Sequence, residues 1–331
     1  MEKPFNKILV ANRGEIAVRV IRTARDMGIK TVAIYSDADK DSLHVLLADE
    51  KYYIGPPPPS ESYLNIERIV EAAKKTGAEA VHPGYGFLSQ NPEFARRLEE
   101  EGIRFIGPSP SVQERVGNKL TARRFFSSKG IPVVPGTLEP IDLHSAPDVA
   151  DKIGYPVLVK PAGGGGGIGM MVAWSEEELK RAIRRAEELS KSAFGVSDVY
   201  LERFIPRAKH IEVQIIADTH GNVFHLFERE CSIQRRYQKV IEETPSPAIT
   251  EDEAKRVHEY AVKAAREVDY VNAGTFKSIF DLDERRFYLL EVNSRIQVEH
   301  PITELVTGVD IVEQQIRVAA GERIDLSDVR R

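Results

Sequence analysis

The chain has 331 residues, of which 42% are hydrophobic and 29% are charged, with a formal net charge of −5 and one cysteine. This length suits two or three layers of α/β structure around well-buried cores. No apolar stretch approaches the roughly eighteen residues that a membrane span needs, and the first residues lack the apolar segment of a signal peptide, so we expect a cytoplasmic protein without membrane contact. Cys231 alone excludes an internal disulfide and a thiolate zinc cluster, and the negative net charge gives no reason to expect a nucleic-acid partner.

The first part of the chain alternates short apolar runs with amphipathic charged segments. Residues 7–36 contain an apolar run, a segment with Ile16, Val20 and Ile21 on one side, a stop at Gly28 and a second apolar run. The pattern recurs around residues 67–86 and 92–109. It predicts a doubly wound, Rossmann-like parallel-sheet domain over residues 1–115. The loop at residues 12–15 does not match G-x-G-x-x-G, so binding of a dinucleotide is not supported.

Longer strands are expected from residue 116 onward, because apolar and charged residues alternate in seven segments between residues 155 and 294. Such alternation is typical of antiparallel strands with one polar face. Helices are expected at 176–192 and 251–268, and hairpin turns at 218–222 and 281–286. These patterns predict a second, α+β domain over residues 116–331, with a small mobile lid at about 134–204.

A run of five glycines follows Lys160 in "KPAGGGGGIGMMV". The run lies between two predicted strands, so it is not a P-loop, which precedes a helix. It could close over the phosphates of a nucleotide, or it could be an ordinary surface loop. Lys160 could offer its charge to a phosphate, although a lone lysine at a strand end is more often solvated.

The densest polar stretch is "EVNSRIQVEHP", residues 291–301. Glu291 and Asn293 leave a strand on the same face and offer oxygen ligands suited to Mg²⁺. Arg295, Gln297 and Glu299 are expected to alternate onto the other side of an extended segment, where an arginine beside a glutamate could hold a small planar anion and take its proton. The same spacing also fits a surface array of ion pairs.

Two further charged segments favour a structural interpretation when taken alone. Arg235, Arg236 and Lys239 lie among glutamates in residues 228–247, which is typical of a solvated face. His210 and Glu212 are expected to alternate outward from a strand, with an ordinary structural role for the histidine.

Taken together, the motifs resemble those of the biotin carboxylase family, the ATP-grasp component of acetyl-CoA, propionyl-CoA and pyruvate carboxylases. The resemblance covers essentially the whole chain in one order: "ILVANRGEIAVR", "HPGYGFLSQN", "FIGPS", "KPAGGGGGIGM", "HIEVQ", "CSIQRRYQK", "NAGTF", "EVNSRIQVEHPITE" and "GVDIV". It implies a pre-ATP-grasp domain followed by an ATP-grasp domain. It also implies that ATP and Mg²⁺, or Mn²⁺, support carboxylation of biotin by bicarbonate through carboxyphosphate, with release of ADP and phosphate.

The resemblance also implies roles for individual residues. Arg295, Gln297 and Val298 would hold bicarbonate, with Glu299 as its base and Lys239 stabilising carboxyphosphate. Glu291 and Asn293 would bind metal, and Tyr85 would contact biotin. ATP would be bound by Lys119, Lys160, Gly165, Gly166, Gly167, Glu202, Arg203, Ile205, His210 and Gln234.

The sequence departs from the family pattern at four positions. Lys277 stands where the family usually has a second metal-binding glutamate, Ile168 and Met171 stand where basic residues are usual, and Gln90 replaces a customary glutamate. A protonated lysine cannot ligate Mg²⁺. We hypothesise that Lys277 supplies part of the lost positive charge, in place of one metal. The alternative is a change that weakens or abolishes turnover.

Members of the family continue with a C-terminal domain that completes the biotin pocket, and we expect this domain to be absent here. Biotin would arrive on a carrier protein, because the chain has no A/V-M-K-M motif, and a separate carboxyltransferase would use the product. The resemblance also implies a homodimer, because members of the family make contacts between their first domains near Arg19. Two alternatives stay open: another ATP-grasp carboxylate ligase, or a catalytically silent nucleotide-binding or assembly module.

Overall fold

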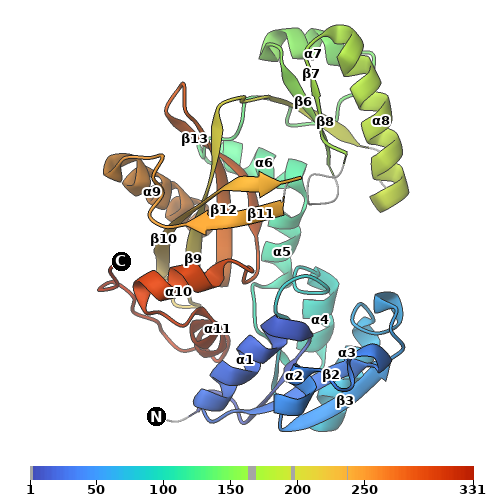
Figure 1. Cartoon of the computed structure of the whole chain (residues 1–331), viewed down its shortest axis with the longest axis vertical. Coiled ribbons are helices and arrows are strands. Elements are labelled where there is room, and N and C mark those ends of the chain that lie inside the picture. The colour runs from blue at the N-terminus through green and yellow to red at the C-terminus, as the bar shows by residue number, and fades with distance from the viewer. Residues whose placement is uncertain (1–2, 163–168, 195–197, 237) are drawn as a thin grey trace.

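The computed structural model describes residues 3–162, 169–194, 198–236 and 238–331. Figure 1 shows a parallel sheet with its helices at one end, a larger antiparallel sheet in the middle, and a small three-stranded unit with two helices at the other end. The mixed α/β fold class predicted from the sequence is therefore confirmed. No helix within the described ranges is both long and apolar enough to cross a membrane.

The N-terminal sheet has the order β3-β2-β1-β4-β5, and every pairing in it is parallel. Alternate residues of β1 face opposite sides: Ile8 packs with Val20 of α1, and Leu9 packs with Ile69 of α3 and Phe94 of α4. Helices on both faces make this a doubly wound arrangement, as predicted. Its elements are β1 (Lys7–Val10), α1 (Gly14–Asp26), β2 (Lys30–Ser36), α2 (Leu43–Leu47), β3 (Glu50–Gly55), α3 (Ile66–Thr76), β4 (Ala80–His82), α4 (Pro92–Glu100) and β5 (Arg104–Phe105).

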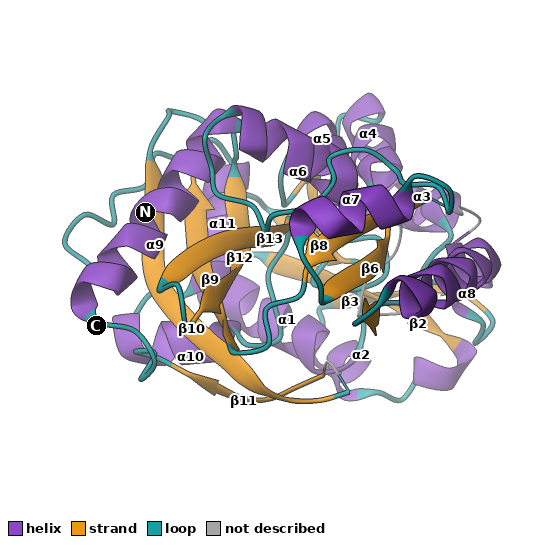
Figure 2. Ribbon diagram, turned by 90° about the horizontal axis from the view of Figure 1, so that it is seen from above, coloured by secondary structure: helices purple, strands orange, loops and turns teal. Residues whose placement is uncertain are grey.

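The central sheet has the order β11-β10-β9-β12-β13 and is antiparallel throughout. Its strands are β9 (Ala208–Ala217), β10 (Val223–Arg235), β11 (Gln238–Glu243), β12 (Asn272–Asp281) and β13 (Arg286–Asn293). One face packs Ile211, Val213 and Ile215 against helices α5 (Pro110–Gly117), α6 (Lys119–Ser128) and α9 (Glu251–Glu267). The alternate residues of β9, beginning with His210 and Glu212, therefore point from the opposite face. Helices α10 (His300–Thr307) and α11 (Ile311–Ala319) follow β13, and Figure 2 shows the sheet from above.

The small unit has the strand order β7-β6-β8, again antiparallel. It consists of α7 (Ala146–Ile153), β6 (Val157–Pro161), β7 (Met171–Ala173), α8 (Glu176–Phe194) and β8 (Val199–Arg203). Val157 and Val159 of β6 pack against Leu179 and Ile183 of α8. The helices expected at 176–192 and 251–268 and both hairpin turns are confirmed. Strand β11 was not predicted, because its charged residues are typical of a solvated face.

Candidate functional site

A cavity of about 410 Å³ lies between the small unit and the polar face of the central sheet. One part of its wall is apolar and carries Leu158, Val172, Phe204, Ile205 and Leu290. Another part is cationic, with five lysines from five different elements: Lys119, Lys160, Lys209, Lys239 and Lys277. The cavity can therefore take a ligand with an apolar end and an anionic end.

Lys160 and Glu202 form a buried ion pair in this wall. They lie on the paired strands β6 and β8, and Lys160 Nζ donates to Glu202 Oε2 over 2.9 Å. The other carboxylate oxygen accepts from Arg123 Nη1 of α6, also over 2.9 Å. Burial lowers the pKa of Lys160, but Glu202 and Tyr200 together raise it by more, so the lysine stays charged. The expectation of a solvated Lys160 is wrong, because its side chain is buried between strand and helix.

Lys119 is held at the first turn of α6. The Asn118 side chain accepts from the backbone N–H of Thr121 and caps that helix. Burial lowers the pKa of Lys119, and the neighbouring positive charges of Lys160 and Lys277 act in the same direction. An anion would relieve this repulsion among the lysines.

His210 uses only one of its two ring nitrogens for a hydrogen bond within the described residues. Its Nδ1 accepts a 3.1 Å hydrogen bond from Nε2 of Gln234, and its buried Nε2 has no hydrogen-bond partner among the described residues. Burial lowers the pKa of His210 to about 4, so the ring is neutral and its proton lies on Nε2. His210 lines the cavity, and its Nε2 lies 3.9 Å from Glu212 Oε2.

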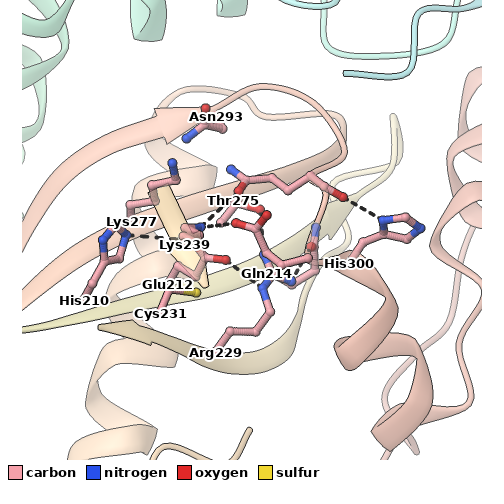
Figure 3. Close-up of polar contacts among 12 residues, drawn as sticks. His210, Glu212, Gln214, Arg229, Cys231, Lys239, Thr275, Lys277, Asn293 and His300 are labelled. Atoms are coloured by element: carbon pink, nitrogen blue, oxygen red, sulfur yellow. Dashed lines mark hydrogen bonds and ion pairs between the residues drawn. The ribbon is translucent and has the colours of Figure 1, made fainter. Parts of the chain in front are cut away.

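Glu212 lies at the centre of a charged cluster beneath the cavity (Figure 3). Its side chain is completely buried and accepts from Arg229 Nε over 2.7 Å and from Lys239 Nζ over 2.5 Å. Burial raises the pKa of Glu212, but these two cations lower it by more. The expectation that Glu212 points outward is wrong, because the polar face of β9 is enclosed.

Lys239 also contacts Glu299, so one ammonium joins two carboxylates. Its Nζ lies 3.4 Å from Oε1 of Gln297. Strand β11 turns Lys239 inward, whereas Arg235 and Arg236 are exposed, so the solvated-face interpretation holds for the arginines and is wrong for Lys239.

Arg295 is held by three neutral oxygens. Its guanidinium donates to Gln90 Oε1 at 2.6 Å, to the Ile296 carbonyl at 3.0 Å and to Asn293 Oδ1 at 3.1 Å. No carboxylate in the described parts of the chain makes a salt bridge with it. An arginine whose contacts are all neutral keeps its charge available for an anion.

The segment that carries Arg295 is not the extended strand expected. Strand β13 ends at Asn293 and α10 begins at His300, so residues 294–299 form a loop and a turn. Ile296, Gln297 and Glu299 are buried while Val298 is 60% exposed, so two adjacent buried residues interrupt a simple alternation. The alternation of buried and exposed side chains has to end where a strand gives way to a helix. The sequence pattern did not reveal where it ends.

Glu291 and Asn293 leave β13 together, as predicted, but Lys277 is bound to the carboxylate. Lys277 Nζ donates to Glu291 Oε1 over 3.1 Å, and Asn293 Nδ2 lies 3.4 Å from the same oxygen. Burial raises the pKa of Glu291, and the charges of Lys277 and Lys119 outweigh this effect, leaving it at about 2. The oxygens of Glu291 and Asn293 can still serve one divalent cation.

Some predicted residues lie elsewhere. Arg203 reaches the cavity wall but pairs with Glu284 at 2.7 Å. Tyr85 does not line the cavity; its side chain packs against the core around α1. Met171 packs on the core of the small unit. Gly165, Gly166, Gly167 and Ile168 lie outside the described residues.

Two residues of the site were missed from the sequence: Arg123 and Arg229. Arg229 could have been found, because it shares the twofold period of β10 with Cys231, a buried residue. Arg123 belongs to the site because it contacts Glu202, 79 positions later in the chain. A local sequence pattern gives no information on such a contact.

Both halves of the chain match known protein families. Residues 4–113 match the family "Biotin carboxylase, N-terminal domain", and residues 118–327 match "Carbamoyl-phosphate synthase L chain, ATP binding domain". Biotin carboxylase 2 of Bacillus subtilis is 52% identical over 330 residues, which is 99% of this chain and 74% of that protein. The chain belongs to the biotin carboxylase family. Another relative is a pyruvate carboxylase subunit of Methanothermobacter thermautotrophicus, 54% identical over 97% of this chain; the chain spans 65% of that protein.

Solved biotin carboxylase structures have the same fold. The biotin carboxylase of Campylobacter jejuni, solved as a β-γ-ATP complex, has a TM-score of 0.96 and 44% identity over 98% of this chain and 73% of its own. The biotin carboxylase domain of Hydrogenobacter thermophilus 2-oxoglutarate carboxylase has a TM-score of 0.93 and 50% identity over 97% of this chain and 70% of its own. That domain was solved as a dimer with MgADP, ADP and bicarbonate.

Proposed function

We propose that the chain is the ATP-using part of a biotin carboxylase, which activates bicarbonate with ATP and transfers its carboxyl group to biotin. The observation that carries the proposal is the pairing of a lysine-lined cavity with an arginine that has only neutral contacts. A phosphorylated cosubstrate needs the lysines, and a small anion needs the arginine.

The nucleotide is proposed to lie with its adenine against Leu158, Phe204 and Ile205 and its phosphates at Lys119 and Lys160. Glu202 would stay paired with Arg123 when Lys160 turns to a phosphate, so binding leaves no isolated buried carboxylate. His210, which lines the cavity, is proposed as a further contact of the nucleotide. Mg²⁺, held by Glu291 and Asn293, would neutralise charge on the phosphates.

Bicarbonate is proposed to bind Arg295 beside Gln297 and the backbone at Val298. Glu299 would take the bicarbonate proton, while a bicarbonate oxygen attacks the terminal phosphorus and the bond to ADP breaks. This gives carboxyphosphate and ADP. Lys239 contacts Glu299 and would stabilise the mixed anhydride after the transfer.

The remaining assignments are also proposals. Residues 1–115 and 116–331 are proposed as two domains, with residues 134–204 as a lid over the nucleotide, supported by the three separate sheets. Biotin would come on a carrier protein and pass near Tyr85, and a carboxyltransferase would receive the carboxyl group. A homodimer is proposed by analogy with the Hydrogenobacter domain.

The test is release of ADP from ATP with and without bicarbonate, and with and without free biotin. Bicarbonate-dependent release that Glu299→Gln abolishes would support the proposal, provided that the variant still binds ADP. A second candidate is a silent nucleotide-binding module, which the Lys277–Glu291 pair favours because it occupies an expected metal ligand. Binding of ADP without bicarbonate-dependent release by the chain would favour that second function.

A further inference from the structure

Four charged residues form one row across the polar face of the central sheet. The strand register places Arg229 of β10 opposite Glu212 of β9, Glu212 opposite Lys277 of β12, and Lys277 opposite Glu291 of β13. The signs therefore alternate from strand to strand. The row ends at the cavity, whose wall contains both Lys277 and Glu291.

Each carboxylate in the row faces a fixed cation. Arg229 Nε lies 2.7 Å from Glu212 Oε1, and Lys277 Nζ lies 3.1 Å from Glu291 Oε1. Lys277 is only 13% exposed and stands between two carboxylates on neighbouring strands, so its ammonium is confined to this place. A lysine at the edge of the molecule would have no such restriction.

The carboxylates of the cavity wall are consequently poor partners for two divalent cations. Glu202 uses one oxygen for Arg123 and the other for Lys160. Glu291 has one oxygen on Lys277. The Asn293 oxygen accepts from Arg295. The donor set fits one divalent cation and does not fit a pair held between two carboxylates.

We propose that Lys277 is a built-in cation of the phosphate site, which does part of the work of a divalent metal in binding the nucleotide. The inference rests on the proposed nucleotide function and deepens it. When a nucleotide enters, the ammonium can exchange its contact with Glu291 for a phosphate oxygen, moving within a site where Lys119 and Lys160 already supply positive charge. Binding of ADP should then depend weakly on Mg²⁺.

The experiment measures the Kd of ADP by calorimetry in Mg²⁺ and in EDTA, for the unaltered chain, Lys277→Gln and Lys277→Glu. The matched control is Lys75→Gln, an exposed lysine on α3. We expect the unaltered chain and the control to lose less than about tenfold in affinity on removal of Mg²⁺. Lys277→Gln should weaken binding in EDTA by about tenfold or more, and Lys277→Glu should weaken it further while gaining Mg²⁺ dependence.

The possible results separate the role of Lys277 from the nucleotide site itself. If the unaltered chain binds ADP only with Mg²⁺, the role of Lys277 is overturned while the nucleotide site stands. If it binds ADP in neither condition, the proposed function fails and this inference fails with it. The comparison on the unaltered chain needs no variant, so Mg²⁺-dependent binding would overturn the role of Lys277 even if a Lys277 variant does not fold.

Discussion

Oε1 of Gln90 accepts a 2.6 Å hydrogen bond from Nε of Arg295, across 205 positions in the chain. The acceptor is a neutral amide, so the bond orients the guanidinium without cancelling its charge. Burial lowers the pKa of Arg295, which makes the charge costly unless an anion arrives. Gln90 therefore prepares Arg295 to bind an anion.

Gln90→Glu should weaken this anion site. A carboxylate at position 90 would form a salt bridge with Arg295 and compete with bicarbonate, raising the KM for bicarbonate about tenfold. Gln90→Met removes the acceptor without adding charge and should have a smaller effect. The measurement is the dependence of ADP release on bicarbonate concentration, with the Kd of ADP unchanged in both variants. Equal effects of the two variants would mean that charge at position 90 is irrelevant.

Gly136 should be required for the placement of Glu202. A Cβ atom at this position would lie 2.2 Å from the Leu201 carbonyl oxygen and 2.8 Å from the Glu202 Cα atom, both of which are backbone atoms. Gly136→Ala must therefore displace β8, and we expect at least about a tenfold loss of ADP affinity together with a lower melting temperature. Gly117→Ala is the matched control, because nothing lies within 4 Å of its Cβ position. An unchanged affinity in Gly136→Ala would show that β8 tolerates the shift.

Arg229 should be essential for stability. It is fully buried and donates to Glu212, Gln214, Thr275 and Thr303 at distances of 2.7–3.1 Å. Arg229→Met would leave these groups with lost partners, and we expect a fall of about 3–5 kcal/mol in the free energy of unfolding measured with urea. Arg207→Met breaks a pair whose side chains are 70% and 58% exposed, and should cost no more than about 1 kcal/mol. Similar losses in the two variants would contradict the assignment of Arg229 to the core of the site.

His82 should make stability fall in acid. It is fully buried, its Nδ1 accepts from the Gly84 N–H over 3.0 Å, and its Nε2 lies 3.1 Å from the Gln315 oxygen. The ring is therefore neutral, and burial lowers its pKa from 6.5 to about 4. Below pH 6.5 the unfolded chain binds a proton that the folded chain refuses, so the free energy of unfolding should decrease by roughly 3 kcal/mol down to pH 4.

This pH effect is checked by urea unfolding at intervals between pH 7 and pH 4. His82→Gln should make the slope shallower in that range without abolishing it, because burial also lowers the pKa of His210, whereas His144→Gln, at an exposed position, should leave the slope unchanged. The opposite sign, with stability rising as the pH falls, would mean that the ring is charged in the folded chain.

The sequence predicted most helices and strands correctly. It did not predict which charged side chains become buried and paired when these elements pack together. Apolar periodicity identified α1, α8 and α9 and the long strands, because each has one buried face whose period is local. The burial of Lys160 and Glu212 was not predicted, since it results from strands and helices that meet only in the folded chain. Lys277 was noticed as a departure from a family pattern, but its position between two carboxylates follows from the register of three strands. Local patterns carry no information on such register.

The lysine-lined cavity is proposed to bind the phosphates of ATP, and every other functional assignment depends on this binding. The direct measurement is calorimetric titration of a non-hydrolysable ATP analogue into the unaltered chain and into Lys160→Met. Because Glu202 keeps Arg123 as a partner, the variant should fold, which its melting temperature checks. We predict binding of one analogue per chain and at least about a hundredfold weaker binding in the variant. Equal affinity in both proteins, or no binding to the unaltered chain, would contradict the proposed role of the cavity.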